Sequence, residues 1–167
     1  MKEARVAILM GSDSDWPTFE AATGILTQFG LGFDVRVLSA HRSPAQVRQY
    51  VLQAPRRGIR VFIAGAGGAA HLAGVVASHT TSPVIGVPIE TKTLKGIDSL
   101  LSTVQMPKGV PVATVAIGNA ANAALLAVQI LAVHDAELTK RLAEHKRELT
   151  AQTIKADRAL QAKIVRG

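Results

Sequence analysis

The sequence predicts an α/β fold: a doubly wound sandwich in which helices cover both faces of a sheet of five parallel strands. Short apolar runs alternate with longer stretches of helical pattern along most of the chain. Four of the five runs are apolar almost throughout, which is typical of strands buried on both faces of a parallel sheet. No internal repeat or linker interrupts the 167 residues, so we expect a single domain over residues 1–167.

The expected strands and helices follow one another in alternation. Only the second run alternates charged and apolar residues, and each of the others has at most one charge. The expected strands are Arg5–Met10, Phe33–Leu38, Arg60–Ala64, Val84–Val87 and Val112–Ile117. The expected helices between them are Trp16–Phe29, Pro44–Arg57, His71–Thr80 and a short one near Gly96–Val104.

The last part of the chain consists of a strongly apolar segment followed by a highly charged one. Within Ala120–Val133, only Asn122 and Gln129 are polar, so this helix should be buried on more than one side, against the sheet and against another subunit. Residues 135–167 carry 8 basic and 5 acidic residues and a thin apolar stripe. We expect one or two helices here, an extension over about residues 134–167 that lies along the body or on a neighbouring subunit. For the last ten residues, a solvated helix with a fraying end is an equal alternative.

Composition narrows the possible functions. The chain has no cysteine, which excludes disulfides and thiolate metal sites. Its longest apolar runs are shorter than the roughly 18 residues of a membrane helix, and its first residues lack a signal-peptide core, so we expect a cytoplasmic protein. The formal charge of +7 leaves nucleic acid or an anionic substrate open, but 4% aromatic residues argue against a single-strand stacking platform. A mean hydropathy of +0.24 indicates apolar surface covered by a partner subunit.

In an open parallel sheet, ligands bind beyond the carboxyl ends of the strands, so the loops there are the first candidates for a site. The loop after the first strand, residues 11–17, reads GSDSDWP. The helix that follows can offer its free N–H groups to a phosphate, and an aspartate can accept hydrogen bonds from ribose hydroxyls. The alternative is an ordinary helix start, with Ser14 or Asp15 as N-cap and Pro17 in the first turn.

The loop after the second strand, residues 39–44, reads SAHRSP. Arg42 can hold a phosphate with two hydrogen bonds, and His41 is suited to proton transfer near neutral pH. A lone histidine in a loop is also commonly just a surface residue. The other histidines, at positions 79, 134 and 145, lack the spacing of a zinc site.

The loop after the third strand, residues 65–72, reads GAGGAAHL and carries few side chains, so a ligand can approach its backbone closely. Gly65, Gly67 and Ala70 match the weak dinucleotide pattern G-x-G-x-x-A. That pattern belongs after the first strand, however, and the acidic residue it requires would be Glu90, which lies in a loop. We therefore do not expect a dinucleotide here.

Six segments of the sequence, in order, resemble one family. They read GSDSDWP, SAHRSP, AGAGGAAHLAG, VIGVPIE, GIDSLLSTVQMPKGVPVATVAIG and NAALLAVQIL. Together they look like the class I N5-carboxyaminoimidazole ribonucleotide (N5-CAIR) mutases of purine biosynthesis, once called the catalytic subunit of phosphoribosylaminoimidazole carboxylase. The resemblance extends to about Leu142. It implies a flavodoxin-like three-layer α/β/α sandwich that assembles as a homo-octamer.

The reaction that the resemblance implies is carboxylate migration in IMP biosynthesis: CO2 leaves N5 of N5-CAIR and is added at C4. No metal, nucleotide cofactor or ATP is implied, and neither nucleic acid nor a membrane is an expected partner. His41 would shuttle the proton that leaves C4, His71 would lie near the carboxylate and the base, and Arg42 would bind on the phosphate side. The other implied substrate-binding residues are Ser12, Asp15, Ser39, Ala40, Gly67, Gly68, Ala69, Ala70 and Leu72.

The chain departs from the family pattern at three places. Ala73 stands where the family usually has proline, Ser43 replaces a threonine, and the segment from Gly118 to Asn122 is shorter by about two residues. Two other functions remain open. The related class II enzymes carboxylate aminoimidazole ribonucleotide with CO2 directly, but they resemble SAHKGP in the second loop. A receiver-like module would need an aspartate at the end of the third strand, where this chain has Gly65.

Overall fold

The computed structural model describes residues 3–164, and the chain divides into two compact units at Ile130. In the first unit, five strands form one parallel sheet with the order β2-β1-β3-β4-β5. The strands are β1 (Ala4–Met10), β2 (Gly32–Val37), β3 (Val61–Gly67), β4 (Val84–Ile89) and β5 (Ala113–Thr114). The predicted α/β fold with five parallel strands is confirmed, and the strand order is that of flavodoxin-like sheets.

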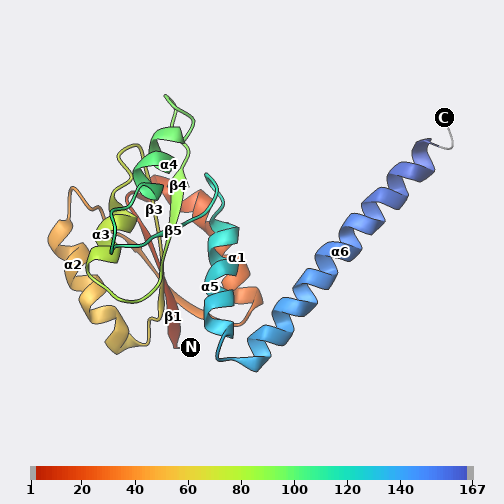
Figure 1. Ribbon diagram of the computed structural model, residues 1–167, viewed down its shortest axis with the longest axis horizontal. Coiled ribbons are helices and arrows are strands. Elements are labelled where there is room, and N and C mark those ends of the chain that lie inside the picture. The colour runs from red at the N-terminus through yellow and green to blue at the C-terminus, as the bar shows by residue number, and fades with distance from the viewer. Residues whose placement is uncertain (1–2, 165–167) are drawn as a thin grey trace. The chain divides into compact units, whose positions relative to one another are not determined.

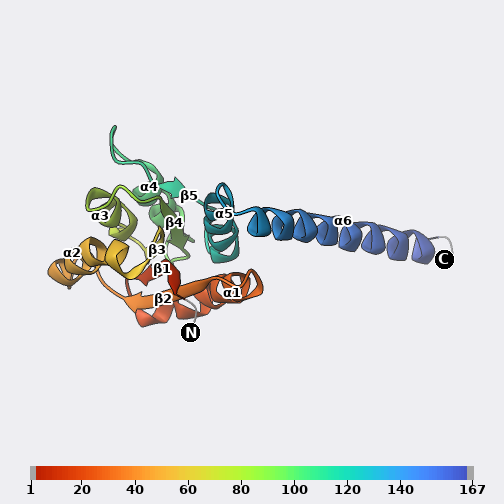
Figure 2. The ribbon, with the colours of Figure 1, turned by 90° about the horizontal axis from the view of Figure 1, so that it is seen from below.

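Helices cover both faces of this sheet (Figures 1 and 2). One face carries α1 (Trp16–Gln28) and α5 (Ala120–Ala132). The other carries α2 (Pro44–Gln53), α3 (Leu72–Ser78) and α4 (Ile97–Val104). Two 3-10 turns complete the unit: η1 (Asp13–Asp15) leads into α1, and η2 (Ala54–Arg57) follows α2. The result is the expected three-layer α/β/α sandwich.

The core lies on both sides of β1 and β3. On one side, Ala7 and Leu9 of β1 and Phe62 of β3 pack in one cluster with Val47 of α2 and Val76 of α3. The neighbouring residues of these strands, which point to the opposite face, are equally buried. The continuously apolar runs in the sequence therefore correspond to strands covered on both faces.

Strand β5 is much shorter than predicted, with two residues in place of Val112–Ile117. Two bonds continue beyond it, because Val115 N–H donates to the Gly86 carbonyl at 3.0 Å and Gly118 N–H to the Pro88 carbonyl at 2.9 Å. These carbonyls show that residues 86 and 88 of β4 direct their backbone groups toward β5. Proline has no N–H to donate, so the regular ladder stops where Pro88 should have supplied the next bond.

Helix α4 has its polar side inward. Ser99 is fully buried and Thr103 is 3% exposed, whereas Ile97 and Leu101 are about half exposed. A helix that covers a sheet normally turns its apolar stripe inward. The reversal indicates that the surface beneath α4 presents polar groups, and the loop described below supplies them.

The second unit is dominated by one helix, α6 (Ala136–Ile164), of 29 residues. The Asp135 carboxylate accepts a bond from Leu138 N–H at 3.1 Å and so caps its first turn. The helix continues through the tail, so one helix forms where we expected one or two, and residues 165–167 of the predicted fraying end lie outside the described part. Within residues 3–164, no helix is both long and apolar enough to cross a membrane.

Candidate functional site

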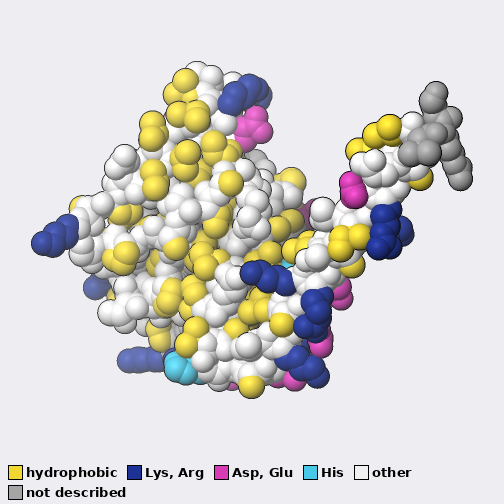
Figure 3. Space-filling model, turned by 45° about the vertical axis from the view of Figure 1, so that its right-hand side comes forward, with side chains coloured by type: hydrophobic (Ala, Val, Ile, Leu, Met, Phe, Trp, Pro, Cys, Tyr) yellow, Lys and Arg dark blue, Asp and Glu magenta, His cyan; other side chains and the backbone are white. Residues whose placement is uncertain are grey.

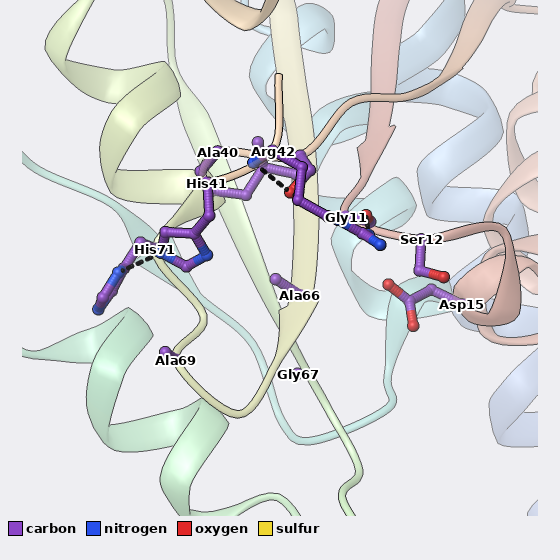
Figure 4. Close-up of a pocket in the computed structure, with 12 residues that line it drawn as sticks. Gly11, Ser12, Asp15, Ala40, His41, Arg42, Ala66, Gly67, Ala69 and His71 are labelled. Atoms are coloured by element: carbon purple, nitrogen blue, oxygen red, sulfur yellow. Dashed lines mark hydrogen bonds between the residues drawn. The ribbon is translucent and has the colours of Figure 1, made fainter. Parts of the chain in front are cut away.

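A pocket of about 320 Å³ lies at the carboxyl ends of β1, β2 and β3 (Figure 4). The order of the strands reverses between β1 and β3, and doubly wound folds bind their ligands at such a switch point. The three loops singled out from the sequence meet here. The lining residues are Gly11, Ser12, Asp15, Ser39, Ala40, His41, Arg42, Ala66, Gly67, Ala69, His71 and Leu72.

The structure gathers most, but not all, of the predicted site residues at this pocket. Two of them, Gly68 and Ala70, do not line it. Ala70 is only 1% exposed and is part of the support of the third loop. Two lining residues, Gly11 and Ala66, were not predicted. Both are small residues at the ends of strands. Gly11 offers only its backbone and Ala66 only a methyl group, so neither has a side chain that points to a function.

The first loop is organised by Ser12. Its side-chain oxygen accepts bonds from the Ser14 N–H at 3.3 Å and the Ser14 hydroxyl at 2.9 Å, and its carbonyl accepts from Asp15 N–H at 3.2 Å. Ser12 thus caps the 3-10 turn η1, while Asp15 occupies the N-cap position of α1 without a side-chain capping bond. The alternative is therefore confirmed in position, with Asp15 as the N-cap residue and Pro17 in the first turn, but the Asp15 side chain makes no capping bond. The Asp15 carboxylate is left to face the pocket.

The Asp15 carboxyl is partly buried at the edge of the pocket. Burial raises the pKa of its carboxyl above the usual 3.8, and hydrogen bonds from Ser12 and Ser14 and the charge of Arg42 offset only part of that rise. An ionised carboxylate here lacks some of the solvation that it would have in water. Hydroxyl donors from a ligand would restore it, which suits Asp15 to binding a sugar.

Hydrogen bonds between Ser39 and Ser43 join the two ends of the second loop, and this loop carries Arg42. The Ser43 hydroxyl accepts from Ser39 N–H at 3.0 Å and lies 3.1 Å from the Ser39 carbonyl, to which it can donate. The Ser39 hydroxyl in turn accepts from the Arg42 backbone N–H at 3.2 Å and from its Nε at 3.4 Å. A threonine at position 43 would keep the same hydroxyl. The departure from the family pattern therefore leaves this closure intact.

Arg42 ties the second loop to the first. Its Nη2 donates to the Gly11 carbonyl at 2.7 Å (Figure 4), and Gly11 N–H donates to the Gly65 carbonyl at 3.1 Å. The three loops are therefore linked through backbone groups at their bases. Arg42 is the only Lys or Arg among the twelve lining residues. It is the one fixed positive charge that the pocket can offer to an anion.

The two histidines form a hydrogen-bonded pair. His41 Nε2 lies 2.8 Å from His71 Nδ1, and the rings meet edge to face at 78° with their centroids 4.9 Å apart. In Figure 4, His41 lies between His71 and the side of the pocket that holds Ser12 and Asp15. One nitrogen of the pair must donate and the other accept, so the contact requires at least one neutral ring. The nitrogens outside the contact, His41 Nδ1 and His71 Nε2, are then free for proton transfer.

Hydroxyl groups that were not among the predicted site residues bind the backbone of the third loop on the side away from the pocket. Gly68 N–H donates to Ser99 Oγ at 2.9 Å, and Ala70 N–H donates to Ser102 Oγ at 3.0 Å. Both serines belong to α4 and neither lines the pocket. Their signal in the sequence was the pair of serines three residues apart inside the apolar stretch IDSLLSTV. Such a pair lies on one side of a helix and can face unpaired backbone groups.

Within residues 3–164, no group of three or more His, Cys, Asp or Glu side chains is arranged to hold a metal ion. The pocket contains one carboxylate, two imidazoles and one guanidinium, between walls of glycine, alanine and serine. Chemically, it can bind an anion, hold hydroxyl groups and move a proton.

The chain has relatives among known proteins. It is 59% identical over 138 residues to the N5-carboxyaminoimidazole ribonucleotide mutase of Saccharolobus solfataricus, covering 83% of this chain and 87% of that protein. It is 56% identical over 132 residues to the phosphoribosylaminoimidazole carboxylase of Candida albicans, covering 79% of this chain but 23% of that longer protein. The crystal structure of Treponema denticola PurE superposes with a TM-score of 0.84 at 28% identity, covering 92% of this chain and 96% of that one.

The match to a whole family is equally extensive. Residues 5–152 match the family model described as AIR carboxylase. The matched part of the chain includes all three loops of the pocket and the two serines of α4 that bind the third loop. Because the model spans most of the chain and the fold agrees with a solved relative, the chain belongs to the AIR carboxylase family.

Proposed function

We propose that this protein is an N5-CAIR mutase that converts N5-CAIR into 4-carboxy-5-aminoimidazole ribonucleotide in purine biosynthesis. Relatives that are 54–59% identical over most of the chain carry the name of that mutase. The observation in the structure that carries the proposal is the pair of histidines beside a wall of glycine and alanine. Such a site supplies a proton carrier next to a space that fits a small, uncharged molecule such as CO2.

The reaction balances without any co-reactant. The N5–C bond of the carbamate breaks, CO2 departs, and N5 keeps the electron pair and gains a proton. The C4 carbon then attacks CO2 with its π electrons, the new C4–C bond forms, and C4 loses its proton. One proton has moved from C4 to N5 and nothing has been oxidised or reduced. A single imidazole that begins protonated, gives its proton to N5 and then takes the proton from C4 therefore suffices.

His41 is the proposed shuttle because it lies on the pocket side of the pair. When His41 Nε2 donates to His71 Nδ1, the Nδ1 of His41 carries a lone pair that can accept the proton from C4. His71 then selects this tautomer, in the way that an orienting group fixes a catalytic imidazole. The side-chain-poor third loop keeps CO2 close to C4, which replaces recapture from solution by an intramolecular step.

The remaining lining residues fit the rest of the substrate. Arg42 offers its free N–H groups to the phosphate, and Ser12 and Asp15 offer acceptors and a hydroxyl to the ribose. Ser39 acts through Arg42, whose backbone and side chain it holds. Ala40, Gly67, Ala69 and Leu72 complete the walls. Gly68 and Ala70 belong to the frame of the loop.

The test is product formation from two substrates, with the variant His41→Asn. We expect turnover of N5-CAIR without ATP, and we expect His41→Asn to fold and bind substrate while losing about 100- to 10,000-fold in kcat, the range that general acid–base catalysis supplies. Exchange of the C4 proton with deuterium should stop in the same variant. Turnover of aminoimidazole ribonucleotide plus bicarbonate at the mutase rate would instead assign the chain to the direct carboxylases. Full activity in His41→Asn would remove His41 from the mechanism.

Octameric assembly, with α6 at subunit contacts, and a cytoplasmic location are parts of the same proposal. Large apolar side chains on α4 and in the loop before it are about half exposed, and hydrophobic side chains are numerous on the face shown in Figure 3. A single chain of 17.5 kDa rarely exposes so much apolar surface unless a partner covers it. Light scattering should give a mass of about 140 kDa for eight copies. A monomer would contradict the proposed assembly.

A further inference from the structure

The loop that leads to His71 has almost no side chains of its own to hold it in place. From Gly67 to Ala70 it carries nothing larger than a methyl group, and Gly68 has a positive φ of 68°. A loop of this composition gains little from apolar contacts, so its position depends on hydrogen bonds to its backbone. Two such bonds lie within the loop, from Ala70 N–H to the Gly68 carbonyl and from His71 N–H to the Ala69 carbonyl, both at 2.9 Å, and the bonds that tie the loop to the rest of the fold come from α4.

Ser99 bridges the loop to the end of β4. Its Oγ accepts from Gly68 N–H at 2.9 Å and donates to the Ile89 carbonyl at 2.6 Å, and the residue is fully buried. One hydroxyl therefore pairs with two backbone groups from different segments, the N–H of Gly68 and the carbonyl of Ile89.

Ser102 holds the loop one step further along. Its Oγ accepts from Ala70 N–H at 3.0 Å and lies 3.0 Å from the Gly68 carbonyl, while its proton can also go to the Asp98 carbonyl at 2.7 Å. The two serines together contact both ends of the segment 68–70. Because neither lines the pocket, neither can touch a ligand there.

The segment that they hold passes directly into His71. The His71 carbonyl accepts from Val75 N–H at 3.0 Å, so the backbone of His71 is already part of the start of α3. Its ring makes the 2.8 Å contact with His41. A shift of residues 68–70 would move His71 and lengthen that contact.

We propose that Ser99 and Ser102 are positioning residues: their bonds to the backbone of residues 68 and 70 hold His71 against His41. This inference rests on the proposed function for its kinetic consequences, but its geometric consequence is independent of it. The phosphate and ribose sides of the pocket belong to the first two loops. Loss of either serine should therefore lower kcat and leave KM nearly unchanged.

The variants are Ser99→Ala and Ser102→Ala, and the matched control is Thr103→Val. Thr103 lies on the same helix, is nearly as buried as Ser99, and donates its hydroxyl to the Ser99 carbonyl at 2.7 Å within the helix. Its loss tests the cost of removing a buried hydroxyl from α4 without touching the loop. We expect a fall in kcat of at least about tenfold in the serine variants, the scale of a small misplacement of catalytic groups, and less than about twofold in the control.

Two further measurements separate positioning from simple destabilisation. Ser102→Thr keeps the hydroxyl and should recover most of the lost kcat. In a His71→Asn background, Ser102→Ala should have little further effect on kcat, because the group that it positions is already gone. A tenfold loss that persists in that background, or a loss of the same size in Thr103→Val, would overturn the proposal. Ser102 is only partly buried, so its variants keep the test available if Ser99→Ala does not fold.

The geometric readout needs no activity. In a crystal structure of Ser102→Ala, the separation between His41 Nε2 and His71 Nδ1 should exceed the hydrogen-bond limit of about 3.5 Å, while the control keeps its 2.8 Å contact. An unchanged contact in the serine variant would refute the inference. If the wild-type chain fails to turn over N5-CAIR, the proposed function fails, and this structural comparison still decides the positioning role.

Discussion

Replacement of Arg42 by lysine tests the anion-binding side of the pocket. The substitution keeps the positive charge and removes the planar fork. Arg42 uses two of its five N–H donors within the protein, Nη2 toward the Gly11 carbonyl at 2.7 Å and Nε toward Ser39 Oγ at 3.4 Å. Three donors remain on the two terminal nitrogens, enough to hold two phosphate oxygens. Lysine has one nitrogen and cannot hold the Gly11 carbonyl and two phosphate oxygens with the same geometry.

The expected magnitude follows from the bonds lost. A hydrogen bond between charged partners contributes about 1.5–3 kcal/mol, and the loss of one such bond to the phosphate would weaken binding about 10- to 150-fold. The loss should appear in KM, with kcat within a few-fold of wild type, because the histidine pair lies on the other side of the pocket.

The assay is steady-state turnover of N5-CAIR at fixed salt concentration, with Arg48→Lys as control. Arg48 is an exposed residue of α2 that does not line the pocket, so its replacement should leave KM unchanged. An unchanged KM in Arg42→Lys would show that the phosphate binds elsewhere. A loss confined to kcat would place Arg42 in the chemistry and not in anchoring.

Two further substitutions test the electrostatics and the packing beneath the site. Asp15→Asn should stabilise the ligand-free protein by less than about 1 kcal/mol at pH 7. Burial raises the pKa of the Asp15 carboxyl, so the native state favours the protonated acid. The charged form that is present at neutral pH therefore destabilises the fold, and the asparagine removes that charge. This gain should fade as the pH falls toward 3.8, which urea titrations at several pH values would detect, and a gain that grows on acidification would contradict it. Gly65→Ala should cost about 1–3 kcal/mol, because a Cβ would collide with the Phe19 ring and lie 3.1 Å from a backbone carbonyl. Its control, Gly24→Ala, meets nothing within 4 Å on α1 and should stabilise by about 0.5–1 kcal/mol, and equal unfolding midpoints for the two variants would refute the packing argument.

The fold was predictable because the strands are buried on both faces. Apolar runs such as those of β1 and β3 have few alternatives to a covered parallel sheet, and the helices between them begin at recognisable serine and proline residues. The length of β5 was not predictable in the same way. The residue that ends its ladder is Pro88, which lies in a different strand, and a pattern read along residues 112–117 does not include its pairing partner.

The pocket was predictable to the extent that it is made of side chains at the ends of strands. His41, Arg42 and Asp15 were visible as polar residues in the right loops, and the parallel sheet brings those loops together. The roles of Gly11, Ser99 and Ser102 could not be assigned from their places in the sequence, because these roles depend on which backbone carbonyls and N–H groups lie nearby. Which carbonyl accepts from Arg42, and which N–H needs a hydroxyl, follows from the folded path of the chain.

The two sides of α4 connect the local chemistry to the proposed assembly. Its inner side provides hydroxyls because the loop beneath it has backbone groups to satisfy, and its apolar residues are displaced outward as a result. Burying Leu101 and Ile97 within the chain would require turning the helix, which would remove Ser99 and Ser102 from the loop. The orientation of α4 that holds the loop in place therefore leaves the apolar side chains of Leu101 and Ile97 exposed to solvent. A second subunit on that surface would bury these side chains and so stabilise the orientation of α4 on which the histidine pair depends.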